Sequence, residues 1–272
     1  MMFIYLLLVI ITLVLSFYLF KRSQHASKSL RNKPFVIAHR GSSGDYPENT
    51  HSSFQAAIDC QADFIEFDIQ LTKDLQFVVI HDQTLERTTN GQGKVSDCTL
   101  KELQELDAGS WKSPTFSTER IPSLLEVLEK YHGKTKFLIE VKFAKNQPKY
   151  ADLLVNLLDD YQYIWDDIII QSFNVSFLRA FHKKMPQIAI GVLVRHQYHG
   201  LSEARIKEMS SFATFINPKI TMANKQLLSK IFKHSAHCFI WTVKNKQDFQ
   251  KLERLHPTGI VTDYPEWYKS QT

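Results

Sequence analysis

The stretch that decides the fold is residues 63–82, DFIEFDIQLTKDLQFVVIHD, in which two short apolar runs flank a polar turn at 72–74. A connection this short between two strand-like runs predicts an antiparallel hairpin. Side chains two residues apart on a strand share a face, so Glu66 and Asp68 are expected to project together. Folding about the turn would lay His81 roughly opposite them. The hairpin therefore predicts a cluster of two carboxylates and one imidazole.

Two ionised carboxylates held side by side repel each other, and a divalent cation with oxygen ligands relieves that repulsion. We therefore expect a metal ion at Glu66 and Asp68, with a half-buried strand bearing a solvated acidic face as the alternative. Glu140, in the run 136–142 KFLIEVK, is a candidate third ligand. An unpaired carboxylate among apolar residues would be costly, and a shared cation resolves that cost. An ion pair between Glu140 and a nearby Lys or Arg is the alternative there.

Composition bounds the class of protein. The chain has 272 residues, of which 44% are hydrophobic, and can bury one large core, so either a single barrel-sized domain or two smaller domains fit its length. Its three cysteines are scattered and fit neither a disulfide framework nor a zinc site. The net charge of +5 comes entirely from five basic residues before residue 34, because 28 basic and 28 acidic residues follow. This balance excludes a general nucleic-acid-binding surface.

The amino-terminal run 3–20, FIYLLLVIITLVLSFYLF, is uncharged over 18 residues, near the lower limit for a helix that crosses a bilayer. We interpret residues 1–20 as an uncleaved transmembrane anchor. The alternative, a cleaved signal peptide, lacks a basic residue ahead of the run and a small-x-small site behind it. The protein is thus expected to be a single-pass membrane protein.

The basic residues all follow the apolar run, so the positive-inside tendency favours a cytoplasmic domain, while the extracellular side stays open. Residues 21–33 read as a basic juxtamembrane linker. This linker is either in contact with anionic lipid headgroups or simply solvated.

From residue 34 to residue 272 short apolar runs alternate with amphipathic stretches. Eight strands are predicted, at 35–39, 63–69, 136–142, 167–172, 188–194, 214–217, 238–243 and 259–263. Strands that alternate with helices indicate an α/β fold, here a TIM (β/α)₈ barrel, with 76–81 as an additional antiparallel arm. Residues 84–122 interrupt the alternation and are expected to form a cap or lid, or to pack on the barrel mouth.

In such barrels the chemistry lies where the strands end. The predicted strand ends are polar almost throughout: His39-Arg40-Gly41, Glu66 with Asp68, Glu140 with Lys142, Gln171-Ser172, Asn217-Pro218, Trp241-Thr242 and Thr262-Asp263. One rim of the barrel should collect them.

The chain resembles the glycerophosphodiester phosphodiesterase family from about residue 36 to residue 265. No single matching segment is diagnostic, but ten in the same order are highly specific. They are His39-Arg40-Gly41, Pro47-Glu48-Asn49-Thr50, Glu66-Phe67-Asp68, His81-Asp82, Arg87-Thr88-Thr89-x-Gly91, Ile121-Pro122-Ser123-Leu124, Ile139-Glu140-Val141-Lys142, Gln171-Ser172-Phe173, Trp241-Thr242-Val243 and Thr262-Asp263-Tyr264-Pro265.

The resemblance implies that Glu66, Asp68 and Glu140 bind a divalent cation, Ca²⁺ or Mg²⁺, and that His39 and His81 form the acid–base pair. It further implies that Arg40 and Lys142 contact the phosphate and that Trp241 packs against the glycerol carbons. Lys244 departs from the family pattern, in which asparagine is common, and this puts only the shape of the rim in question.

The activity expected from these residues is cation-dependent hydrolysis of glycerophosphodiesters to sn-glycerol 3-phosphate and an alcohol. Cleavage needs charge neutralisation, an activated nucleophile and a protonated leaving group. We assign His39 as the base and His81 as the acid. Two alternatives remain open, namely a lysophospholipase D acting on single-chain lipids and a catalytically inactive binding module on the same scaffold.

Overall fold

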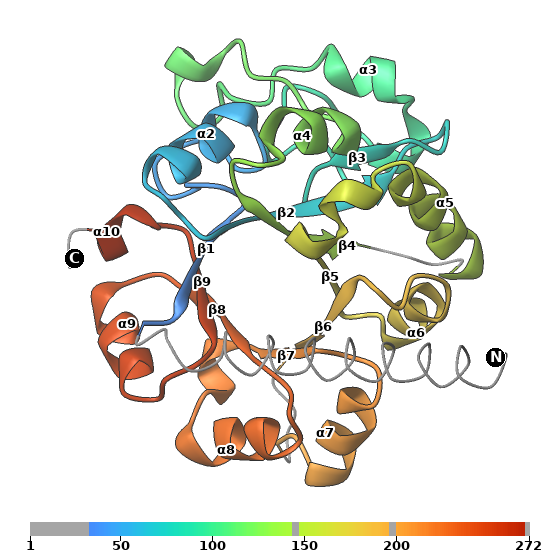
Figure 1. Ribbon diagram of the computed structural model, residues 1–272. Coiled ribbons are helices and arrows are strands. Elements are labelled where there is room, and N and C mark those ends of the chain that lie inside the picture. Colours follow the sequence, from blue (N-terminus) through green and yellow to red (C-terminus); the bar gives the residue numbers. More distant parts are fainter. Residues whose placement is uncertain (1–32, 143–146, 196–199, 270–272) are drawn as a thin grey trace, which may run out of the picture. The chain divides into compact units, whose positions relative to one another are not determined.

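The computed structural model describes residues 33–142, 147–195 and 200–269. Within these residues eight parallel strands form one sheet in the order β7-β6-β5-β4-β2-β1-β9-β8. Two isolated parallel bridges, Phe215 with His237 and Lys219 with Trp241, link β7 to β8 and nearly close the sheet into a barrel. Figure 1 shows this ring of strands inside a ring of helices.

The predicted eight-stranded α/β barrel is confirmed, and no strand boundary departs from the prediction by more than two residues. The parallel strands are β1 (Phe35–His39), β2 (Phe64–Leu71), β4 (Lys136–Val141), β5 (Ile168–Ser172), β6 (Ala189–Val194), β7 (Phe215–Pro218), β8 (Phe239–Val243) and β9 (Gly259–Thr262). The strand β3 (Phe77–Val79) pairs antiparallel with β2, with Ile69 opposite Val79 and Leu71 opposite Phe77. This is the predicted arm.

The helices that surround the barrel begin at polar capping residues. Thr50 and Ser123 each accept a hydrogen bond from the third residue of the helix that follows, in a reciprocal capping box. The helices are α2 (His51–Asp59), α3 (Leu100–Gln104), α4 (Leu124–Tyr131), α5 (Gln147–Asp159), α6 (Val175–Lys184), α7 (Glu203–Ser210), α8 (Lys225–Lys233), α9 (Lys246–Glu253) and α10 (Glu266–Lys269).

The interior of the barrel has an apolar layer and a polar layer above it. One buried cluster joins inward-facing residues of six strands: Ile37, Phe64, Leu138, Ile169, Phe239 and Val261. Because side chains alternate along a strand, the residues two positions further on face the same interior. They include His39, Glu66 and Glu140, and the register pairs His39 with Glu66 and Glu140 with Asp68. The alternation thus places the candidate site directly above the apolar layer.

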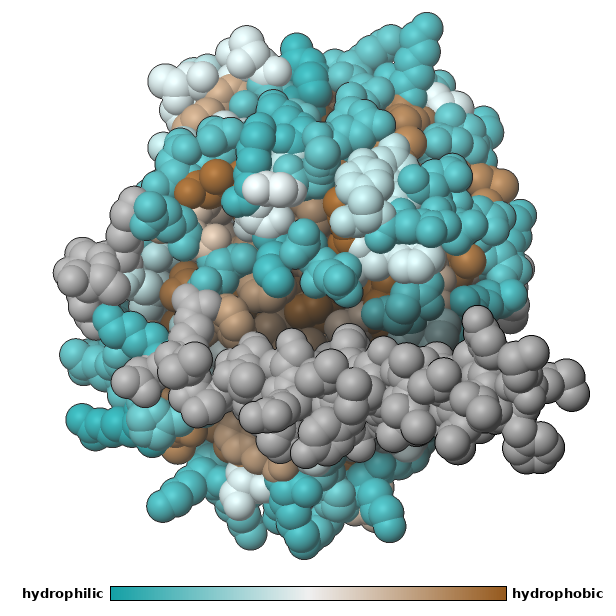
Figure 2. Space-filling view, in the orientation of Figure 1, coloured by the Kyte–Doolittle hydropathy of each residue, from teal (hydrophilic) through white to brown (hydrophobic). Residues whose placement is uncertain are grey.

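The outward-facing residues of the same strands pack under the helices. Ile65, Phe67, Ile139 and Ile170 belong to one large buried cluster together with Phe54, Leu124, Leu154 and Phe177 of the helices. In the same orientation as Figure 1, Figure 2 shows hydrophilic residues over the helices and hydrophobic residues in the hollow at the centre. The outer core holds the ring of strands rigid, so the inward-facing polar layer keeps its geometry.

The insertion 84–122 has a core of its own. Leu85, Val95 and Leu103 are buried in a cluster with Val78 and Ile80 of the arm. The apolar residues of the insertion therefore pack on the arm and not on the barrel mouth. In Figure 1 the insertion lies beside α2 and α4. It contains α3 and two 3₁₀ turns, η1 (Val95–Asp97) and η2 (Pro114–Phe116).

The predicted transmembrane segment, residues 1–20, and residues 21–32 of the predicted linker lie outside the described residues. Among the residues that are described, none of the helices combines the length and the apolar character needed to cross a bilayer.

Candidate active site and metal centre

Three buried carboxylates meet at the carboxyl ends of two neighbouring strands. Glu66 and Asp68 come from β2 and Glu140 from β4, and these residues are at most 7% exposed. One oxygen of each lies within 4.8 Å of the others, and in the described part of the chain this is the group of three that fits a metal ion. Acidic oxygens at this spacing match the ligands that Ca²⁺ and Mg²⁺ prefer.

Two cationic side chains border this carboxylate cluster. Lys142 Nζ lies 2.5 Å from Glu140 Oε1 and 3.1 Å from Asp68 Oδ1, and Arg40 Nε lies 3.3 Å from Asp68 Oδ2. The backbone N–H of Arg40 donates to Glu66 Oε2 at 2.9 Å. The ion pair between Glu140 and a lysine, left open by the sequence, is therefore present, within reach of the same cluster.

The ion pairs leave room for a cation. If all three carboxylates were ionised, they would outnumber the two cationic side chains by one buried negative charge, which either protonation or a bound cation has to offset. Within the described residues, Asp68 Oδ1 and Glu140 Oε1 are buried and accept no well-aligned hydrogen bond. Both oxygens lie next to the Lys142 ammonium, at 3.1 Å and 2.5 Å, without a well-aligned hydrogen bond. Oxygens of this kind on adjacent carboxylates are ligands that a divalent cation can share, so the residues present fit such an ion.

The three carboxyl groups of the cluster differ in the direction of their pKa shifts. Burial raises the pKa of Glu66 well above its ordinary value, and the charges of Asp68 and Glu140 add to this. Burial likewise raises the pKa of Glu140, to about 7. Burial acts in the same direction on Asp68, but Lys142 and Arg40 outweigh it and lower the pKa of that carboxyl. Without a cation, the negative charge is therefore concentrated on Asp68.

Each of the two candidate catalytic histidines is held by a carboxylate. His39 Nδ1 lies 2.5 Å from Asp263 Oδ1, and His81 Nδ1 lies 2.5 Å from Asp82 Oδ1. Because a carboxylate only accepts hydrogen bonds, Nδ1 of each ring is the donor and Nε2 is free to exchange a proton with a substrate. Burial lowers the pKa of both histidines, so both rings are neutral near pH 7.

The loop after β1 places its side chains through three residues in the left-handed region. Arg40 has φ 55° and Gly41 has φ 79°, which turns the chain sharply and aims the Arg40 N–H at Glu66. Asn49, at φ 60°, donates from Nδ2 to Asp68 Oδ2 at 3.0 Å and accepts from the Asp68 N–H at 3.3 Å. Asparagine tolerates this backbone conformation better than most residues. The loop thus binds Oδ2 of Asp68 through Arg40 and Asn49, whereas Lys142 lies at Oδ1.

Trp241 bounds the rim through a chain of polar contacts. Its Nε1 donates to the Asn217 carbonyl at 2.7 Å, and Asn217 Nδ2 donates to Gln171 Oε1 at 3.0 Å. Gln171 Nε2 lies 3.5 Å from Glu66 Oε1, which links the indole to the carboxylate cluster. The indole ring is half-buried and packs edge-on against Phe173, with the ring centroids 5.6 Å apart. Trp241 therefore has a fixed orientation at the mouth.

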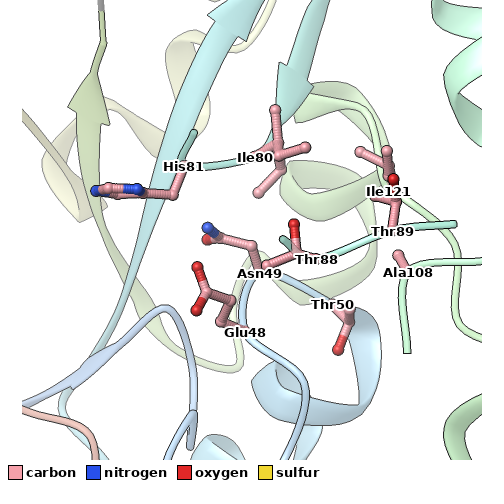
Figure 3. Close-up of a pocket in the computed structure, with 10 residues that line it drawn as sticks. Glu48, Asn49, Thr50, Ile80, His81, Thr88, Thr89, Ala108 and Ile121 are labelled. Carbon is pink, nitrogen blue, oxygen red and sulfur yellow. The ribbon is translucent and has the colours of Figure 1, made fainter. Parts of the chain in front are cut away.

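A small cavity lies between the β1 loop and the insertion. Figure 3 shows Glu48 and Asn49 beside Thr88, with His81 next to Ile80. Its volume is about 10 Å³, enough for the centre of one water molecule, and its lining includes Glu48, Asn49 and Thr88. The insertion lines this cavity with two polar residues, Thr88 and Thr89, and two apolar ones, Ala108 and Ile121.

The structure brings all eight predicted site residues to one rim. It adds four residues outside the predicted set, Glu48, Asp82, Arg87 and Asp263. Asp82 and Asp263 orient the two histidines, and Glu48 binds both Arg40 and Arg87. Asp82 follows His81 directly and Asp263 directly follows β9, so their positions were visible in the sequence. Their partners were not, because the pairings of Asp263 and Glu48 join residues far apart along the chain.

The comparisons with known proteins agree with this geometry. The model of the glycerophosphoryl diester phosphodiesterase family matches residues 39–267. YhdW of Bacillus subtilis, whose name assigns it glycerophosphodiester phosphodiesterase activity provisionally, is 44% identical over 233 residues, which cover 86% of this chain and 96% of that protein. A glycerophosphodiester phosphodiesterase of Caldanaerobacter subterraneus is 38% identical over 237 residues, with 86% and 96% covered.

Among solved structures, a phosphodiesterase of Oleispira antarctica in complex with the product sn-glycerol 3-phosphate superposes with a TM-score of 0.80. It is 30% identical, and the match covers 87% of this chain and 96% of that one.

Proposed function

Since the chain belongs to the glycerophosphoryl diester phosphodiesterase family, we propose that it cleaves glycerophosphodiesters to sn-glycerol 3-phosphate and an alcohol, using a divalent cation and two histidines. Its class as a glycerophosphodiester phosphodiesterase follows from the family match and from the relatives at 44% and 38% identity. The single observation that supports the mechanism best is the buried trio Glu66, Asp68 and Glu140 together with two oriented histidines. His39 is bound by Asp263 and His81 by Asp82.

Glu66, Asp68 and Glu140 would hold the cation. When bound, a Ca²⁺ or Mg²⁺ ion supplies positive charge that neutralises a phosphoryl oxygen. The chain's own Arg40 and Lys142 would contact the remaining phosphoryl oxygens, because both already lie at the edge of the carboxylate cluster. An anionic phosphodiester would thus meet a pocket whose charge complements it.

The two histidines would move the protons. His39, neutral and anchored through Nδ1, would take a proton on Nε2 from the nucleophile, either water or the neighbouring glycerol hydroxyl. His81 would give a proton from Nε2 to the departing alcohol, and the anionic substrate favours the protonated ring that this requires. Trp241 would pack its half-buried ring against the glycerol carbons.

A second candidate activity, lysophospholipase D, draws support from an open groove of about 460 Å³ near the rim. Seven of the residues that line it are apolar, namely Phe173, Val175, Val192, Leu193, Val194, Leu201 and Met209, and the other two are Arg195 and Arg205. Phe173 also contacts Trp241, so the groove is next to the ring proposed to bind glycerol. A groove of this size and character can take one hydrocarbon chain.

The experiment that tests the main proposal is hydrolysis of glycerophosphocholine by the purified protein, before and after chelation, with Ca²⁺ or Mg²⁺ added back. We expect activity to vanish with the chelator and to return with one of the two ions. Full activity in the chelator would contradict cation dependence, and no activity in any condition would favour the inactive binding module. Faster turnover of lysophosphatidylcholine than of glycerophosphocholine would favour the lysophospholipase D.

We also propose that residues 1–20 anchor the enzyme in the cell membrane with the barrel on the cytoplasmic side. Support comes from the uncharged run 3–20 and the five basic residues that follow it. Protease added to intact cells should leave the barrel intact, whereas protease added to inverted vesicles should digest it. Digestion in intact cells would place the domain outside.

A further inference from the structure

Arg87 connects the insertion to two groups of the proposed active site. Its Nη1 and Nη2 donate to the two oxygens of Glu48, each at 2.8 Å, and its Nε donates to Asp82 Oδ2 at 2.5 Å. All three guanidinium nitrogens are therefore used on two carboxylates. A bidentate pair of this kind fixes direction as well as distance.

Both carboxylates bound by Arg87 have a second partner in the site. The other oxygen of Asp82 faces Nδ1 of His81 at 2.5 Å. Glu48 Oε1 also accepts from Arg40 Nη1 at 2.7 Å, and Arg40 in turn pairs with Asp68. Two chains of contacts thus run from Arg87, one to His81 and one through Arg40 to the carboxylate cluster.

We propose that Arg87 is a positioning residue that sets the orientation of His81 through Asp82 and of Arg40 through Glu48. This inference rests on the proposed function, because it assumes that His81 and Arg40 act on the phosphodiester. The insertion would then support catalysis indirectly. Its Arg87 would orient His81 and Arg40 without contacting the substrate or the cation.

The simpler interpretation, a surface ion pair with no role, fits the site less well. The Arg87 side chain is 45% exposed, but those of its partners are not, at 12% for Glu48 and 29% for Asp82. Exposed pairs of single contacts contribute little because solvent and side-chain entropy offset them. Here one guanidinium makes three hydrogen bonds to two carboxylates that also bind Arg40 and His81, so its loss would leave Glu48 held by Arg40 and Asp82 held by His81.

His39 provides an internal comparison. Its carboxylate, Asp263, is held by Ser43 and by Lys244, whose Nζ is 3.4 Å away and whose side chain is 66% exposed. Of the two candidate catalytic histidines, His81 is the one whose carboxylate, Asp82, also binds a guanidinium from the insertion. The proposal therefore predicts a defect at His81 and none at His39 when Arg87 is removed.

The matched control is Arg179. Its side chain is 42% exposed and its Nη2 donates to Glu208 Oε1 at 2.9 Å, so it resembles Arg87 in type, exposure and partner. It lies on α6 and has no contact with the residues of the proposed site.

The test compares Arg87→Ala, Arg87→Lys and Arg179→Ala in the full-length protein with the cation bound and glycerophosphocholine as substrate. We expect Arg87→Ala to lower kcat by ten- to a hundredfold, with Tm and the affinity for Ca²⁺ or Mg²⁺ close to those of the wild type. Added guanidinium should restore part of the activity of Arg87→Ala. Arg87→Lys should remain impaired, because an ammonium cannot engage both carboxylates. Arg179→Ala should match the wild type.

A second readout does not depend on turnover. Nitrogen NMR of the imidazoles should show a single Nδ1–H tautomer for His81 in the wild type and a mixture in Arg87→Ala, with His39 unchanged. An Arg87→Ala protein with normal kcat and an unchanged His81 signal would overturn the proposal. If Arg87→Ala unfolds and guanidinium does not restore its activity, the folded Arg87→Lys variant decides. An unchanged His81 signal in Arg87→Lys would then overturn the proposal as well. A wild-type protein that shows the His81 signal but hydrolyses no glycerophosphodiester would refute the proposed function alone.

Discussion

His39 and His81 differ from the other histidines of the described chain in having a carboxylate on Nδ1 and a position at the end of a barrel strand or its arm. Each carboxylate fixes the tautomer and the direction of its ring. Burial lowers the pKa of both rings, whereas the negative charge of Asp68 acts on both rings to raise it. At this scale the site is a pair of oriented imidazoles about one acidic cluster.

The first prediction concerns these two rings. His39→Ala and His81→Ala should each lower kcat by about 10²- to 10⁴-fold, the range for loss of a positioned general acid or base. Ca²⁺ or Mg²⁺ affinity, measured by calorimetry, should change little, because neither ring belongs to the carboxylate cluster. A single variant with near-normal turnover would contradict the two-histidine mechanism.

The second prediction concerns Asp263 and pH. Burial opposes its ionisation, but His39 and Lys244 outweigh burial and lower its pKa to about 2, from an ordinary value of 3.8. A carboxyl with a lowered pKa in the folded state stabilises the protein above pH 4, and this stabilisation is lost as the pH falls toward 2. A shift of this size corresponds to about 2 kcal/mol.

Asp263→Asn should therefore unfold at lower urea concentration than the wild type at pH 7, with a free energy of unfolding smaller by about 2 kcal/mol. The difference should shrink between pH 4 and pH 2. A difference that stays constant over this range would mean that the charge of Asp263 is not what stabilises the fold.

At the scale of elements, the loop from β1 to α2 depends on a close approach that only glycine allows. Gly41 has φ 79°, and a Cβ there would lie 2.6 Å from the Ser53 backbone carbon in α2. Ser53 cannot move away easily, because its Oγ donates to the carbonyls of Arg40 and Thr50. The turn that aims Arg40 at Glu66 is thus built against the first turn of α2.

Gly41→Ala should destabilise the protein by more than the roughly 1–2 kcal/mol that a left-handed alanine costs, and it should also lower activity by displacing Arg40 and His39. The control is Gly133→Ala, because Gly133 has φ 72° and nothing within 4 Å of a built Cβ. Both variants place alanine in the left-handed region, but only Gly41→Ala brings a Cβ against Ser53. Thermal unfolding and kcat of the two variants therefore separate the cost of the backbone conformation from the cost of the steric overlap. Equal effects in both would show that the approach to Ser53 does not matter.

The elements themselves were largely predictable from the sequence. The eight strands fall within two residues of their predicted bounds, because each is an apolar run bounded by polar or turn-forming residues. The insertion was not predictable in the same way. Leu85, Val95 and Leu103 carry no periodicity that shows which surface they cover, and they pack with Val78 and Ile80 of the arm.

At the scale of the whole molecule, the three buried clusters begin at Phe35 and include no described residue before it. We therefore predict that a truncated variant starting at Lys33 folds with a Tm within a few degrees of the full-length protein. Its kcat with soluble glycerophosphocholine should also be close to that of the full chain. An insoluble or inactive variant would show that residues 1–32 contribute to the barrel or the site.

The sequence by itself determined the barrel and the position of its acidic cluster. Alternation within each strand fixes which side chains face inward, so Glu66, Asp68 and Glu140 had to share one interior once the strands were parallel neighbours. Folding about the hairpin turn placed His81 beside this cluster. The motifs in a fixed order added His39, Arg40, Lys142 and Trp241.

Only the tertiary structure decided how these residues are held. The pairs His39 with Asp263 and Glu48 with Arg87 join residues 224 and 39 positions apart, and Lys142 turned out to pair with both Asp68 and Glu140. Periodicity is a local property of one strand or helix, whereas the partner of a charged side chain depends on which distant loops the closed barrel brings to the same rim. That is why the sequence predicted the acidic cluster and the two imidazoles, and the folded chain was needed to show what orients them.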